Sequence, residues 1–121
     1  MLQAEDVHVV VRGEVDDKQR QHARERIAHA ARHVRDPILF ARVTLTAAPE
    51  PRRGRPVMVR ALLDVSGQTV QAATSAATMH EGLDHLHDRL RDQFAHLASR
   101  RHARRRRAER DAELHSAFPL V

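Results

Sequence analysis

The sequence predicts an α+β domain of the order βαβββα, with a four-stranded mixed sheet and two helices packed on one of its faces. Four short segments alternate apolar and polar residues, which is typical of strands with one buried face. Two other segments repeat apolar residues every three or four positions, which is typical of amphipathic helices. Because only one face of the strands is apolar, we expect both helices on that face.

The first strand is predicted over residues 7–12, which read VHVVVR. Asp16 or Asp17 is a favourable N-cap for the helix that follows, which is predicted to run to about His33. The helix should end before Pro37, because the residue before a proline is pushed out of the α region. Its buried stripe is narrow and rich in alanine, and consists of Ala23, Ile27, Ala30 and Val34. Since a helix connects the first two strands, they should be parallel neighbours.

The second strand is predicted over residues 38–46. Its expected buried positions are Leu39, Ala41, Val43 and Leu45. The stretch at residues 48–56 is rich in proline and arginine and is predicted to be an exposed loop. Strands at 57–65 and 69–74, joined by a tight turn at 66–68, should form an antiparallel hairpin.

The last helix begins at a capping box formed by Thr78 and Glu81. Its apolar stripe is the longest in the chain and consists of Met79, Leu83, Leu86, Leu90, Phe94 and Leu97. The helix is expected to continue into an arginine-rich run and to fray there, because adjacent like charges repel. The folded domain is therefore predicted over residues 1–103, followed by an arginine-rich, partly disordered tail over residues 104–121.

Positive charge is concentrated near the end of the sequence. Residues 1–99 hold 14 Lys and Arg against 13 Asp and Glu, whereas residues 100–110 hold seven Arg against one Glu. Such a local excess attracts polyanions, of which nucleic acid is the commonest, although a solvated tail that only maintains solubility is the alternative. With three Phe and no Trp or Tyr, contacts to phosphate and to shape should outweigh base stacking.

Each predicted helix also carries a polar ridge beside its apolar stripe. The ridge of the first helix consists of His22, Arg26, His29 and His33. The ridge of the last helix consists of His85, Arg89, Asp92, His96, Arg100 and Ala103. If the helices pack side by side, the two ridges are expected to border one groove. The alternative is that both are ordinary solvated faces of amphipathic helices.

Several function classes are disfavoured by what the sequence lacks. Without cysteine there are no disulfides, thiolate metal sites or cysteine nucleophiles, which fits the cytoplasm. No segment resembles a signal peptide or a membrane span, so no membrane partner is expected. The histidine pairs His29/His33 and His85/His87 lack a third metal ligand, so no metal or cofactor is expected. No nucleophile motif or phosphate-binding loop is present, so we expect neither an enzyme nor a small-molecule substrate.

The element order, Arg12-Gly13 after the first strand, the Gly67 turn and the Thr78-Met79 helix start resemble the ribosome hibernation factors. These comprise the promoting-factor and ribosome-associated-inhibitor group, also called sigma-54 modulation proteins. The run Leu83-Asp84…Arg89-Leu90…Gln93-Phe94 is similar to the family's Ile-Asp…Lys-Leu…Gln-Leu helix. The resemblance covers residues 5–102. It implies a domain similar to double-stranded-RNA-binding folds that occupies the messenger and transfer RNA channel of the small ribosomal subunit in resting cells.

The resemblance also implies that basic residues of the two helices contact ribosomal RNA. This sequence departs from the family at His29 and His96, where lysine is usual, and at Asp92, where arginine is usual. The arginine run is expected to compensate for these lost charges. The candidate RNA-binding residues are Arg20, Arg26, Arg32, Arg89, His96, Arg100, Arg101, Arg104 and Arg105. Longer family members append a domain that pairs ribosomes, and nothing after His115 resembles it, so the chain is either a short form or a piece of a longer protein.

Two hypotheses of function follow. The first is a non-catalytic, cytoplasmic translation inhibitor that binds the small subunit and its RNA under stress. The second is a protein-interaction module or homodimer that uses the exposed sheet face or the hairpin edge, with the basic tail only solvated. A role in transcription is suggested only by the family's older name.

Overall fold

The computed structural model describes residues 2–48 and 56–117, with the backbone alone at residues 101 and 113–117. A short 3-10 turn precedes six elements: β1 (His8–Arg12), α1 (Asp17–Ala30), β2 (Ile38–Ala47), β3 (Val57–Val65), β4 (Gln68–Ala76) and α2 (Met79–Ala117). The strand order in the sheet is β1-β2-β3-β4, with β1 and β2 parallel and the other pairs antiparallel. The predicted βαβββα order and mixed sheet are therefore confirmed.

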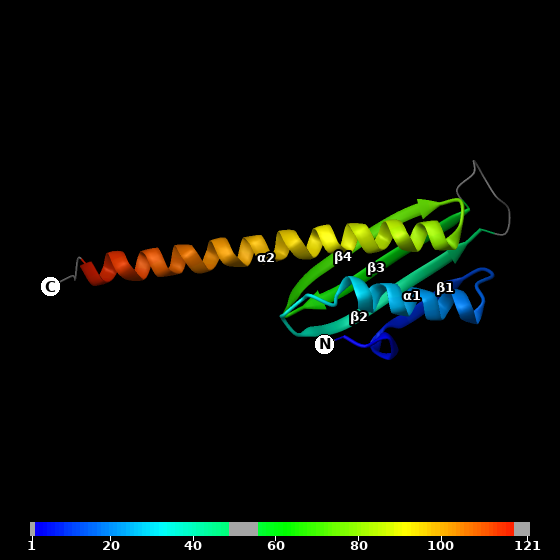
Figure 1. The fold of residues 1–121 in the computed structure, drawn as a ribbon, viewed down its shortest axis with the longest axis horizontal. Coiled ribbons are helices and arrows are strands. Elements are labelled where there is room, and N and C mark those ends of the chain that lie inside the picture. Colours follow the sequence, from blue (N-terminus) through cyan, green and yellow to red (C-terminus); the bar gives the residue numbers. More distant parts are fainter. Residues whose placement is uncertain (1, 49–55, 118–121) are drawn as a thin grey trace.

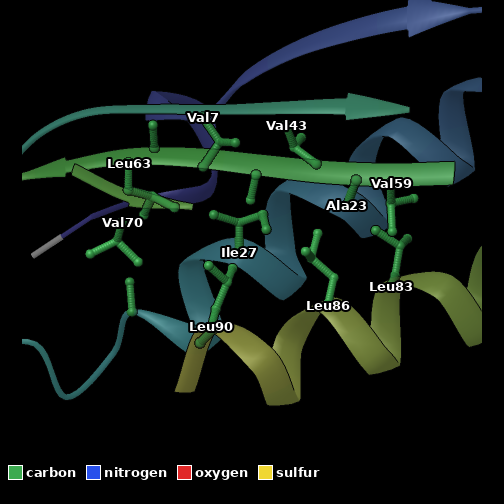
Figure 2. Close-up of a cluster of buried hydrophobic side chains, with 14 of the residues drawn as sticks. Val7, Ala23, Ile27, Val43, Val59, Leu63, Val70, Leu83, Leu86 and Leu90 are labelled. Atoms are coloured by element: carbon green, nitrogen blue, oxygen red, sulfur yellow. The ribbon is translucent and has the colours of Figure 1, made fainter. Parts of the chain in front are cut away.

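Both helices lie on the same face of the sheet, and the opposite face is uncovered (Figure 1). α1 contacts β1 and β2, whereas α2 contacts β3 and β4. The core fills the space between these two layers, where Ile27 of α1 and the leucines of α2 meet the sheet (Figure 2). Every residue of the predicted α2 stripe is buried, from Met79 to Leu97. Packing on the sheet thus follows directly from the helical and strand periodicities.

The starts of both helices are capped, α1 by a complete capping box and α2 by one of the two bonds of the predicted box. The Asp16 carboxylate accepts the backbone N–H of Gln19 at 2.7 Å, and the Gln19 side chain accepts the N–H of Asp16 at 3.1 Å. The Thr78 hydroxyl oxygen accepts the N–H of Glu81 at 3.2 Å. α1 ends at Ala30, about one turn earlier than expected. Val34, which lies beyond this end, is only half-buried.

Two glycines are required by the backbone. Gly13 has φ of 93°, and a Cβ at this position would overlap the carbonyl oxygen of Ala47. Ser66 and Gly67, with φ of 50° and 88°, form the two-residue turn between β3 and β4, since such turns need positive φ at both positions. The Asp64 carboxylate accepts the N–H of Gly67 at 2.7 Å. β4 extends to Ala76, beyond the predicted end of that strand.

The prediction that Leu39 faces the core is wrong. The pairing register between β2 and β3 shifts between Ile38 and Phe40, and Leu39 is 66% exposed. Such an irregularity interrupts strict alternation, because the extra residue is left out of the ladder. Most of the loop predicted at residues 48–56 lies outside the described residues. At its described ends, the N–H of Ala48 donates to the carbonyl oxygen of Pro56 at 2.8 Å.

α2 is much longer than the sheet that it covers. Its last buried residue is Leu97, and the helix continues to Ala117 beyond the end of the sheet (Figure 1). We call residues 79–97 the packed segment and residues 98–117 the helical extension. The predicted tail thus begins inside a helix, and its residues 118–121 lie outside the described part. Within the described residues, no helix is long and apolar enough to cross a membrane.

Candidate nucleic-acid interface

The polar ridge of α1 packs directly against α2. The rings of His22 and His80 stack with centroids 5.2 Å apart. Arg26 Nη2 lies 3.1 Å from Asp84 Oδ1. His29 Nδ1 lies 2.8 Å from His87 Nε2. These three pairs, which we call the histidine seam, occupy positions i, i+4 and i+7 on both helices, the spacing that places side chains on one helical face.

The prediction that the two polar ridges border one groove is therefore wrong. The ridge of α1 meets the α2 flank that carries Asp84 and His87. The predicted α2 ridge lies on the other side of that helix, where Arg89 Nη1 donates to the carbonyl oxygen of Ala73 in β4 at 2.9 Å. His87 and Arg89 are two residues apart, which is about 200° around a helix. The two helices are neighbours, but the ridge of α1 faces α2 whereas the ridge of α2 lies toward β4.

Burial governs the chemistry of the seam at His87, which is 5% exposed. Burial lowers the pKa of His87, with smaller lowering by Arg26 and His29, and the hydrogen bond to Asp88 opposes the shift. Asp88 Oδ1 lies 3.4 Å from His87 Nδ1 and favours a proton on that nitrogen. His87 Nε2 is then the acceptor for the N–H at His29 Nδ1. The seam is a structural contact, and the described residues contain no group of three metal-ligating side chains.

The candidate residues of α1 do not form a common surface. Arg20 and Arg26 are six residues apart in α1, so they point in directions about 120° apart around the helix axis, and Arg32 lies beyond the end of the helix at Ala30. Arg20 is half-buried, with Nη1 3.8 Å from a carboxylate oxygen of Asp17. Arg26 is held in the seam by Asp84. Arg32 is exposed, as is His96 of α2. The candidate residues Arg20, Arg26, Arg32 and His96 are thus dispersed or already paired.

The helical extension is different. The side chains of Arg100, Arg104 and Arg105 are exposed, and none forms an ion pair with a carboxylate of the described residues. The backbone of Arg101 lies in the same helix, and its side chain is outside the described part. Three arginines that are not among the predicted candidates are also exposed: Arg106, Arg107 and Arg110. Of these, Arg106 contacts His102, with Nη2 2.9 Å from Nε2. Their position in the arginine run is the sequence signal that indicates these three residues.

A cleft of about 570 Å³ lies between the segment that follows α1 and the part of α2 where the helical extension begins. Phe94, Leu97 and Val34 contribute to its apolar floor. Its lining also includes Asp36 and five basic side chains: His33, Arg35, Arg91, His102 and Arg105. No local sequence pattern predicts this cleft, because it joins segments about 60 residues apart along the chain.

Comparisons with known proteins agree with this architecture. A family model described as "Sigma 54 modulation protein / S30EA ribosomal protein" matches residues 7–102. The N-terminal domain of Protein Y from Thermus thermophilus is 21% identical, with a TM-score of 0.60 over 74% of this chain and 94% of that chain. A ribosomal subunit interface protein from Coxiella burnetii is 17% identical, with a TM-score of 0.64 over 77% of this chain and 97% of that chain.

At these identities the two structures show a shared fold. A search of curated proteins finds no match. The family model, in contrast, spans well over half of the chain and confirms the resemblance that the sequence motifs indicate. The chain therefore belongs to the sigma-54 modulation protein / S30EA ribosomal protein family.

Proposed function

We propose that this protein is a non-catalytic, ribosome-associated hibernation factor that binds the small subunit in the messenger and transfer RNA channel and blocks translation there. Membership of a family described as ribosomal supports the association with ribosomes. The name of the Coxiella burnetii neighbour, a ribosomal subunit interface protein, supports a position between the subunits. Occupation of the channel needs no chemical step, only contacts to the RNA backbone.

The observation that carries this proposal is the set of exposed arginines on the helical extension whose described side chains form no ion pair with a described carboxylate. Phosphate binding by these side chains breaks no ion pair with a carboxylate in the described part of the chain, so its costs there are desolvation and lost side-chain freedom. Each contact releases counterions from the RNA, which favours binding. Arg26, in contrast, would first have to leave Asp84, which lies 3.1 Å away. RNA binding is therefore assigned mainly to Arg100, Arg104 and Arg105 together with the arginines that follow them. Arg101, whose side chain lies outside the described part, is included because the sequence predicts it.

Sedimentation with purified ribosomal subunits over a range of salt concentrations tests this proposal. We expect binding to small subunits to fall steeply between 50 and 200 mM salt, by roughly 10³-fold if about six phosphates are contacted. Messenger RNA and transfer RNA should compete, because they fill the same channel. Binding that ignores salt, or that is equally tight on large subunits, would contradict the proposal.

A second candidate function is protein interaction or dimerisation through the uncovered sheet face. That face exposes Phe40 at 38% and Met58 at 54%, and Val10 at 39%. These side chains are dispersed among Arg42, Arg60 and other polar residues rather than forming one apolar patch, and a stable dimer usually needs a contiguous patch. Equilibrium sedimentation of RNA-free protein distinguishes the two candidates, since a dimer at micromolar concentration favours the second.

A further inference from the structure

We propose that folded RNA encloses the helical extension and contacts it on opposite sides, rather than receiving it on a single surface. This inference rests on the proposed function, because it describes how the same arginines meet their RNA partner. The proposed function alone does not specify on how many sides of the helix the RNA lies. Two or more phosphate-bearing RNA segments must flank the helix.

The arrangement of the arginines around the helix supports this inference. Arg100, Arg104 and Arg107 follow each other at steps of four and three residues, so they share one side. Arg106 lies on the opposite side from Arg104, because the two are separated by about 200° around the axis, and Arg110 lies between the directions of Arg106 and Arg107. All five side chains are exposed. A helix that lay on a flat anionic surface would need arginines on one side only.

The position of the extension leaves it free to be surrounded. It projects beyond the end of the sheet (Figure 1), and its 20 residues span about 30 Å. Among the described side chains of the extension, Ala98, His102 and Arg105 turn toward the body, where they line the cleft with Arg91 and Arg35. The remaining sides of the helix face no other element of the described structure.

The size of the helix indicates which RNA it fits. An α-helix with its side chains is about 10–12 Å across, and the major groove of a regular RNA duplex is too narrow and deep for it. The minor groove is shallow and would contact one side only. The partner is therefore a passage between separate RNA segments in folded RNA, not a regular duplex. The family model ends at residue 102, so most of this contact lies outside the domain that the family shares.

Charge reversal on opposite sides of the helix tests the inference. Arg104→Glu and Arg106→Glu change the net charge equally at neighbouring exposed positions. Enclosure predicts that each variant lowers the affinity for small subunits by about tenfold or more, because each loses one phosphate contact and adds repulsion. Arg60→Glu on the uncovered sheet face is the matched control for net charge, and we expect less than a threefold loss from it. Regular duplex RNA should bind the unmodified protein more weakly than small subunits do.

The outcomes separate this inference from the proposed function. If the unmodified protein does not bind small subunits, the proposed function fails. If it binds but only one of the two variants is affected, the helix lies on one surface and the enclosure is refuted, while the function stands. A loss equal to that of Arg60→Glu in both variants, or equal binding to regular duplex RNA, also refutes the enclosure. Circular dichroism with unchanged helical content confirms that the variants have not unfolded the extension.

Discussion

The two halves of α2 differ in burial and in charge. The packed segment, residues 79–97, has two arginines against four carboxylates, and its apolar stripe is buried on the sheet. The helical extension, residues 98–117, has seven arginines against three carboxylates, and no described side chain in it is buried. One continuous helix thus combines an acidic, folded half with a basic, exposed half.

This difference shows that stability and binding are separated along a single element. Leucines of the packed segment stabilise the fold by burial of apolar area. The exposed arginines of the extension are expected to contribute little to folding, since exposed charges add almost nothing to stability. Charges in the packed segment are used internally, as the pair of Arg26 with Asp84 illustrates. Substitutions in the packed segment should therefore lower mainly the free energy of unfolding, whereas substitutions in the extension should lower mainly the affinity for RNA.

The largest effect on folding is expected from Leu90→Ala. Leu90 is fully buried, and the substitution should lower the free energy of unfolding by about 2–5 kcal/mol through lost burial and a residual cavity. The exposed Arg107 serves as the comparison, and Arg107→Ala should change the free energy of unfolding by less than about 0.5 kcal/mol. Urea unfolding measures both. Similar losses in the two variants would show that the extension also supports the fold.

A smaller effect is expected from Asp84→Asn, which removes the partner of Arg26. The two side chains are 43% and 27% exposed, so solvent screens their attraction, and we expect a loss of about 1 kcal/mol or less. Asp92→Asn is the control, because it makes the same charge change at an exposed carboxylate without an ion pair to a described residue. If Asp92→Asn destabilises the protein as much, the seam pair contributes nothing specific.

The smallest effect is expected from mild acidification, because Asp88 partly offsets the effect of burial on His87. The pKa of His87 is lowered in the folded protein, so the unfolded chain binds more protons below its ordinary pKa of 6.5. Stability should therefore be complete above pH 6.5, fall as the pH decreases from 6.5 toward the folded pKa, and level off below it. The other charged or titratable groups at this seam are His22, Arg26 and His29 of α1 and His80, Asp84 and Asp88 of α2.

Urea unfolding between pH 5 and 8 measures this dependence. His87→Gln removes the titrating ring, so this variant should show a smaller pH dependence over that range. His102→Gln is the matched control, since His102 is exposed on the extension. An undiminished pH dependence in His87→Gln would assign the effect to other groups.

The fold could be predicted from local patterns because each element has a clear period. The α2 stripe from Met79 to Leu97 and the alternation of β3 both correspond to buried positions in the structure. Leu39 could not be placed, because a register shift depends on pairing between strands and leaves no period in one of them. The end of α1 was placed one turn too late, since a half-buried Val34 fits the helical spacing without being helical.

The candidate site could be predicted only in part, for a related reason. The arginine run is a local feature, so its position in the extension follows from the sequence. The seam depends on which flank of α2 faces α1. The apolar stripes of two amphipathic helices do not determine that choice, because they only show which side of each helix faces the sheet. The matching spacings of His22, Arg26 and His29 and of His80, Asp84 and His87 were a usable signal. These spacings place complementary or stacking side chains at matching positions, i, i+4 and i+7, on the two helices.

One paired measurement tests most directly the claim that the extension carries binding without carrying the fold. In a variant with Gln at positions 104–107, the free energy of unfolding should stay within about 0.5 kcal/mol of the unmodified protein. The slope of log affinity for small subunits against log salt should decrease in magnitude by about 3.6 units, which corresponds to four lost phosphate contacts. An unchanged slope and affinity would contradict the account.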